Sequence, residues 1–150
     1  MKRSAGILIY KKENNEYKIF LAHMGGPYWE KVEDHSWSIP KGEKENNENM
    51  KEAAKREFSE ETNIKLNKDI NYLGSKKVSN NKLITIFISD ENIDISNCKS
   101  NFFEKEINGV TKLFPEMDRY EWFTLKEAKD KILDNQIYFI NKFEEKIKRS

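Results

Sequence analysis

The chain has 150 residues, which fits a single domain, 1–150, with a sizeable core. Its 27 basic residues balance 26 acidic ones, so no global basic field favours a polymeric nucleic acid as partner. One cysteine, Cys98, excludes an internal disulfide, and no apolar run is long enough for a membrane span or a signal sequence, so we expect a cytoplasmic protein without a membrane partner.

The first third of the chain predicts a β-hairpin, a loop and a short strand. Residues 3–10 and 17–22 are rich in β-branched and aromatic residues and predict two strands joined by a polar turn. Two glycines and a proline then end the strand, and a charged loop follows at 30–35. Trp29 in this region is either a recognition residue or a hydrophobic plug in a plain turn. Residues 36–42, SWSIPKG, predict a short strand that ends at the proline.

A helix is predicted after this strand, capped by Asn46 or Asn47 and ending near Thr62. At 100° per residue, one stripe of the helix holds Met50, Ala53, Ala54 and Glu57, and Glu60 and Glu61 continue it by a turn. Such close carboxylates repel by about 1 kcal/mol per pair in water and by about 4 kcal/mol nearer the protein body. A hard divalent cation would offset this repulsion, although a solvated acidic face explains the spacing as well.

The second half of the chain predicts four strands. Residues 70–78 and 83–89 are expected to pair, and the apolar run LITIFI in the second suits the centre of a sheet covered on both faces. Residues 101–107 predict a further strand followed by a polar loop at 108–114, and residues 118–123 alternate as a short strand.

Two helices are expected at the end of the chain. Thr124 and Glu127 form a capping box, and a last helix is predicted from about 136 to 148. The order of elements predicts an α/β fold with helices on both sides of the sheet.

The stretch from Gly42 to Ile64 resembles the Nudix box. Five residues separate Gly42 from Glu48, seven more separate Glu48 from Arg56, and the chain then reads REFSEETNI from Arg56 to Ile64. One defined position departs from the pattern: Asn63 stands where the family has glycine. The departure is mild, because asparagine is the usual second choice for a left-handed residue after a helix. The resemblance implies an α/β/α sandwich with a mixed β-sheet.

The resemblance also implies a metal site. Glu57, Glu60 and Glu61 would bind Mg²⁺ or Mn²⁺, and Glu57 and Glu60 would count among the catalytic residues. Arg56 and Glu48 would form an ion pair that orients the helix. A local pair between Arg56 and Glu52, four residues apart on the helix, is the competing interpretation.

A general base in this family often comes from a Glu before a strand that carries a tryptophan. Glu116, six residues before Trp122, has that place. Glu104 and Glu106 are alternatives, and a solvated loop residue is the remaining interpretation.

Four residues are candidate substrate contacts. In the resemblance, Trp37 would support or stack on the bound group and Gly42 would permit close backbone approach. Lys41 is a candidate phosphate contact or a solvated lysine, and Trp29 could stack on a base.

The function implied by the resemblance is metal-dependent hydrolysis of a phosphoanhydride bond in a nucleotide. The expected substrate is a dinucleoside polyphosphate or a (deoxy)nucleoside triphosphate, and we find no coenzyme A signature. The alternative is a Nudix-fold module that binds a nucleotide without cleaving it. The sequence leaves the scissile bond and the oligomeric state open.

Overall fold

Two long antiparallel strands, β1 (Lys2–Glu13) and β2 (Glu16–Met24), begin the computed structural model, which describes residues 1–149. They are longer than predicted, and the turn shrinks to Asn14 and Asn15, both at positive φ (54° and 65°). Two such residues in a row form the turn whose twist matches that of the strands, so pairing runs to Glu13 and Glu16.

Seven strands make one mixed sheet. Its main path runs β3, β2, β1, β6, β5, with β4 paired to β1 and β9 paired to β2. β1 and β6 are parallel, and all other pairs are antiparallel. The remaining strands of the sheet are β3 (Trp37–Ser38), β4 (Lys41–Glu43), β5 (Asn71–Ser79), β6 (Lys82–Ser89) and β9 (Met117–Thr124). The predicted strand at 36–42 is therefore two short strands, because Pro40 lies between them and cannot donate to a ladder.

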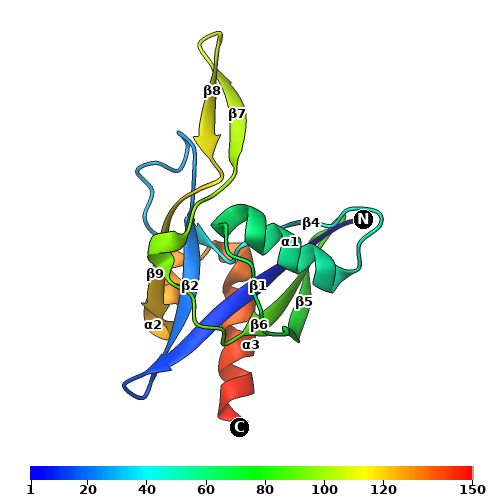
Figure 1. Cartoon of the computed structure of the whole chain (residues 1–150), viewed down its shortest axis with the longest axis vertical. Helices are drawn as coiled ribbons and strands as arrows, with labels where there is room; N and C mark the ends of the chain where they lie inside the picture. The colour runs from blue at the N-terminus through cyan, green and yellow to red at the C-terminus, as the bar shows by residue number, and fades with distance from the viewer. Residues whose placement is uncertain (150) are drawn as a thin grey trace.

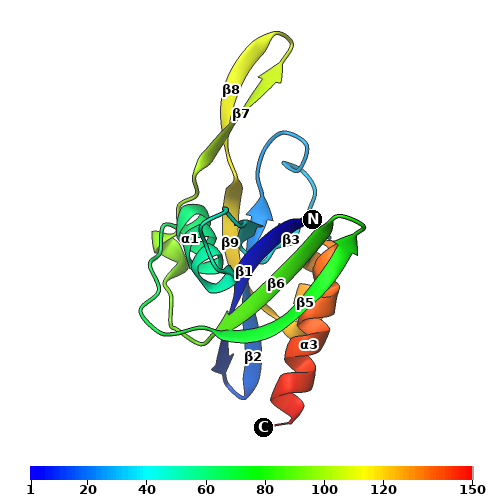
Figure 2. The same ribbon diagram turned by 90° about the vertical axis from the view of Figure 1, so that its right-hand side faces the viewer.

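Helices cover both faces of the sheet, as predicted (Figures 1 and 2). α1 (Met50–Thr62) packs Ala53, Ala54 and Phe58 into one core cluster. The opposite face is covered by α2 (Leu125–Lys131) and α3 (Ile137–Lys148). A 3-10 turn, Asp134–Gln136, joins these two helices, and another, Ile95–Asn97, precedes β7. This arrangement is the predicted α/β/α sandwich.

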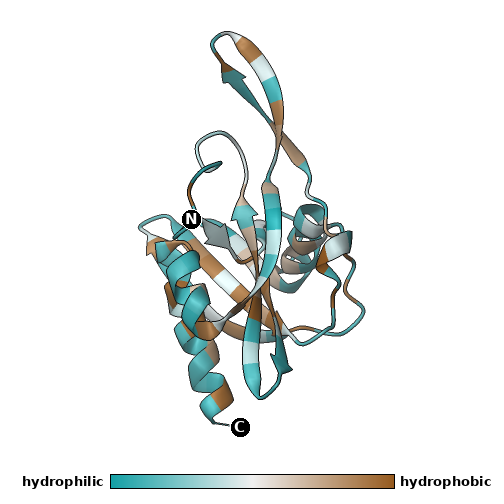
Figure 3. Cartoon of the chain, turned by 90° about the vertical axis from the view of Figure 1, so that its left-hand side faces the viewer, coloured by the Kyte–Doolittle hydropathy of each residue, from teal (hydrophilic) through white to brown (hydrophobic). Residues whose placement is uncertain are grey.

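A projecting hairpin replaces the loop predicted at 108–114. β7 (Phe102–Ile107) pairs with β8 (Val110–Pro115) across a two-residue turn of Asn108 and Gly109, both at positive φ. Figure 1 shows this hairpin standing away from the sheet, and Figure 3 shows apolar bands along it. The Asn-Gly pair is a strong hairpin signal, so the loop prediction was wrong although the sequence held the cue.

The helix boundaries differ from the sequence reading in detail. Asn49, not Asn46 or Asn47, caps α1, because its side chain accepts from the backbone N–H of Glu52 while Glu52 reaches back. The predicted capping box of Thr124 and Glu127 does start α2. No described helix is both long and apolar enough to cross a membrane.

Candidate functional site

The last two turns of α1 present three carboxylates of different exposure. Glu61 is buried at 6% exposed, and the side chain of Glu57 is 13% exposed. The side chain of Glu60 is 42% exposed, so it lies at the edge of the stripe rather than within it. Phe58 and Thr62 take the buried positions between them. The helix thus places two carboxylates toward the sheet and one toward solvent.

Gly42 in β4 lies directly under the Glu57 carboxylate. A Cβ built on Gly42 would stand 2.1 Å from Glu57 Oε2, closer than any real contact allows. The register of β4 against β1 pairs Gly42 with Ala5 and fixes this approach. The glycine is required by a protein side chain that faces its backbone, and its predicted contact with a substrate stays a prediction.

Arg56 gathers the surrounding carboxylates. Its Nε and Nη2 donate to the two Glu48 carboxylate oxygens at 2.6 and 3.0 Å, a bidentate ion pair. Its Nη1 donates to Glu57 at 2.9 Å and to Glu60 at 3.2 Å. The expected pair of Arg56 with Glu48 is therefore formed. The alternative with Glu52 is not, because Glu52 is engaged in the cap of the helix.

Glu61 carries a buried oxygen without a partner. No described residue forms a hydrogen bond with Glu61 Oε1. Burial, and then the charge of Glu57, raise the pKa of Glu61 well above its ordinary value, while Lys41 opposes the rise. A buried carboxylate oxygen without a partner costs free energy, and a cation bound at this atom would offset that cost.

Glu116 joins the cluster from the other half of the chain. It follows the hairpin, and burial, then the charge of Glu60, raises its pKa. The charge of Glu116 also raises the pKa of Glu57 and of Glu61, so the three carboxyl groups repel one another. Glu104 and Glu106 are exposed on β7 and contribute to none of these shifts.

The carboxylates suit a hard divalent cation. Within residues 1–149, no three His, Cys, Asp or Glu side chains converge as a finished metal site. Arg56 Nη1 instead contacts both Glu57 and Glu60, at 2.9 and 3.2 Å. The carboxylate oxygens of α1, Glu61 Oε1 among them, are the kind of ligand that Mg²⁺ and Mn²⁺ prefer.

A family model described as "NUDIX domain" matches residues 1–143. The chain belongs to the Nudix family. No curated protein sequence matches it.

Solved structures resemble this Nudix chain in fold. The Ap4A hydrolase of C. elegans, in a binary complex, is 19% identical over 100% of both chains, with a TM-score of 0.72. The NUDIX domain of Shewanella oneidensis NrtR, crystallised with ADP ribose, is 11% identical over 97% of this chain and 87% of that one, with a TM-score of 0.68. The MutT protein of Methanosarcina mazei is 20% identical over 98% and 95%, with a TM-score of 0.63. At these identities the likeness shows the fold alone.

Trp37 does not offer the Nudix domain a stacking surface. It is fully buried, edge-on to His23 and Phe123, with the Arg119 guanidinium 5.1 Å from its ring centroid. The prediction that it stacks on a bound group is therefore wrong, and only a supporting role is left. Trp29 is half-buried against Tyr28 in the loop after β2.

Lys41 is next to the carboxylates. Burial lowers its pKa most, with Lys82 adding to the effect, while Glu61 and Glu57 oppose it. A lysine this close to the acidic cluster can meet a phosphate oxygen there.

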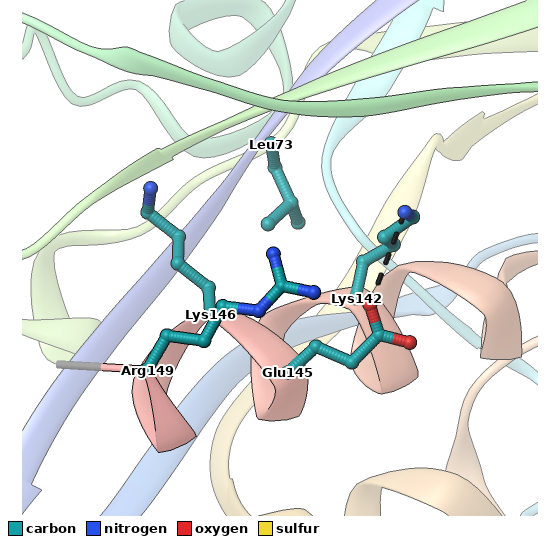
Figure 4. Close-up of a pocket in the computed structure, with 5 residues that line it drawn as sticks. All are labelled: Leu73, Lys142, Glu145, Lys146 and Arg149. Carbon is teal, nitrogen blue, oxygen red and sulfur yellow. Dashed lines mark ion pairs between the residues drawn. The ribbon is translucent and has the colours of Figure 1, made fainter.

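Two clefts flank the body of the domain. One, of about 510 Å³, is bounded by Glu60 and the stem of the β7–β8 hairpin. The other, of about 350 Å³, lies between Leu73 and the end of α3, with Lys142 and Arg149 among its walls and Glu145 3.9 Å from Lys142 (Figure 4). The second is lined by none of the carboxylates of the candidate site. Neither cleft was predicted from the sequence, because the residues around each come from distant parts of the chain.

Proposed function

We propose that this chain is a metal-dependent pyrophosphohydrolase. It cleaves a phosphoanhydride bond in a nucleotide, either a dinucleoside polyphosphate or a (deoxy)nucleoside triphosphate. The observation that carries the proposal is Glu61, a buried carboxylate whose Oε1 has no partner among the described residues, beside Glu57 and Glu116. Carboxylates that repel one another in a core destabilise a fold, whereas a cation bound between them would offset that repulsion.

In this proposal Glu57, Glu60 and Glu61 hold Mg²⁺ or Mn²⁺. Such an ion would neutralise charge at the phosphate oxygens and would acidify the attacking water. Arg56 fixes the direction of Glu57 and is itself fixed by Glu48 and by the backbone carbonyl of Glu43, 2.9 Å from Nη2. Loading the site requires the Nη1 contacts of Arg56 to loosen, while its bidentate pair with Glu48 is kept.

Glu116 is the proposed general base. Its raised pKa favours uptake of a proton from water, and its position opposite Glu60 brings it to the edge where the cluster meets solvent. Lys41 is the proposed phosphate contact, since its charge acts on the same carboxylates from β4.

Hydrolysis assays test the function. The protein is incubated with dinucleoside polyphosphates, nucleotide sugars and nucleoside triphosphates, first with Mg²⁺ and then with EDTA, and the products are separated. We expect cleavage with Mg²⁺, none with EDTA, and a steep loss in Glu60→Gln. Activity that persists in both Glu57→Gln and Glu60→Gln would refute the hydrolase. Nucleotide binding without any cleavage would favour the binding module instead.

Glu116 is tested by an isosteric pair of variants. Glu116→Gln should lower kcat by about 10² to 10⁴, the usual cost of a lost general base. Glu104→Gln removes a carboxylate from the exposed face of the hairpin and should leave kcat unchanged. Unchanged turnover in Glu116→Gln would remove it from the mechanism.

A further inference from the structure

Asn63 is the one position at which the chain departs from the Nudix box. It ends α1 in the left-handed conformation, with φ 61° and ψ 23°, and its backbone N–H donates to Ser59 O at 2.7 Å. Glycine would serve this backbone equally well or better. The asparagine therefore adds only one thing, an exposed amide side chain, which forms no hydrogen bond with any other described residue.

This amide lines the cleft of about 510 Å³. Other residues that line this cleft are Ser59, Glu60, Lys99, Asn101 and Phe102. Glu60 is a proposed metal ligand, so the cleft opens directly from the place where the phosphates would be cleaved.

Backbone hydrogen bonds hold the wall of the cleft against α1. The Lys99 N–H donates to Thr62 O and the Asn101 N–H donates to Glu60 O, both at 3.0 Å. The Glu116 N–H then donates to Asn101 O at 2.8 Å. These bonds fix Lys99 and Asn101 against the C-terminal end of α1, so the cleft is a preformed feature of the fold.

The side chains of the cleft match the parts of a nucleotide. Phe102 is 53% exposed, an open ring on which a base can stack. Asn63 and Asn101 carry amides, which can donate to and accept from base edges and ribose hydroxyls. Lys99 is exposed and forms no ion pair with the described residues, so it can meet a phosphate. One ring, two amides and one cation suit a nucleoside with an attached phosphate.

We propose that this cleft binds the second nucleoside of a dinucleoside polyphosphate, the one on the far side of the scissile bond. The inference rests on the proposed hydrolase function and names its substrate class. Phe102 stacks on the base, Asn63 hydrogen-bonds the nucleoside, and Lys99 contacts a phosphate between Glu60 and the nucleoside. A nucleoside triphosphate has a single nucleoside and gains nothing from these contacts.

The experiment compares diadenosine tetraphosphate with ATP. For each variant, kcat/KM is measured with both nucleotides in Mg²⁺, and binding of both is measured by titration calorimetry. Phe102→Ala should lower the ratio of the two kcat/KM values by about tenfold, the effect of one base-stacking ring. Asn63→Gly should lower it by about three- to tenfold, the effect of one neutral hydrogen bond. Asn63→Gly restores the residue of the family pattern and suits the left-handed backbone, so folding is preserved.

Leu113→Ala is the matched control. Leu113 is 65% exposed on β8 and is not part of the cleft wall, so the ratio should stay at the wild-type value. A ratio unchanged in both Asn63→Gly and Phe102→Ala, in turnover and in binding, would overturn the cleft proposal and leave the hydrolase standing. A wild-type protein that cleaves neither nucleotide would defeat the hydrolase. Tighter binding of the dinucleotide than of ATP, lost in both variants, would still support the cleft.

Discussion

The buried charge of Glu61 makes a prediction about stability that separates a metal site from an ordinary acidic surface. Glu61→Gln keeps the shape of the side chain and removes its charge. Burial first and Glu57 second raise the pKa of Glu61 well above 4.5. At pH 7 only the interval from 4.5 to 7 counts, at about 1.36 kcal/mol per pH unit, so the charge destabilises the metal-free fold by no more than about 3 to 4 kcal/mol.

The variant should therefore be more stable than the wild type in EDTA. In a domain of this length about 1 kcal/mol corresponds to 2–4 °C in Tm, so we expect a rise between about 2 and 10 °C. The gain should shrink toward pH 5, because a raised carboxyl pKa lowers stability only as the pH rises above the unfolded value. Thermal unfolding followed by circular dichroism, in EDTA at pH 7 and at pH 5, measures this difference in Tm.

Added Mg²⁺ should reverse the order. A cation at one hundred times its Kd stabilises the wild type by about 2.7 kcal/mol, and the variant, which lacks a ligand, should gain much less. Glu60→Gln is the control in EDTA, since its 42% exposed side chain should change Tm little. A Glu61→Gln protein less stable than the wild type in EDTA, or an equal Mg²⁺ gain in both, would refute the reasoning.

Three further predictions concern the surroundings of the cluster. Gly42→Ala should lower kcat about 10- to 100-fold with folding retained, because the new methyl group displaces the Glu57 carboxylate; steady-state kinetics and circular dichroism check both. Arg56→Lys should weaken Mg²⁺ binding about 10- to 100-fold by titration, because a lysine cannot form the bidentate pair with Glu48; equal affinity would exclude an orienting role. Burial raises the pKa of the Cys98 thiol to about 11, so a thiol reagent at pH 8 should label it slowly in the folded protein and fast in urea.

Periodicity and turn chemistry predicted the layers of the fold well. The apolar run of β6 lies inside the sheet, between β1 and the edge strand β5, with helices on both faces of the sheet, whereas its composition had predicted the centre. The predictions from the sequence were weaker where two local patterns indicated different structures. Polar composition at 108–114 outweighed the Asn-Gly turn, and the hairpin was missed. At the start of α1 three asparagines were available as caps, and only the match with Glu52 selects Asn49.

The candidate site was predictable where it is local in the chain. Gly42, Glu48 and Arg56 to Glu61 all lie within one strand–loop–helix unit, and the resemblance to the Nudix box implied the pair of Arg56 with Glu48 that the structure contains. The burial of Trp37 was not predictable, because it depends on packing against Phe123 from β9, 86 positions later in the sequence. The cleft beside Asn63 has the same origin, since its far wall comes from the segment at 99–102.

Glu116 was predicted from its place before the strand that carries Trp122. In the structure, long-range backbone hydrogen bonds hold it in position. Its N–H donates to Asn101 O and its carbonyl accepts from the Gly25 N–H, both at 2.8 Å, while Asn101 itself donates to Glu60 O. A Cβ on Gly25 would stand 1.9 Å from Pro115 O, so only glycine permits the approach. The two ends of the hairpin therefore meet beside Glu60, and the hairpin can project into solvent without moving Glu116 away from the carboxylates of α1.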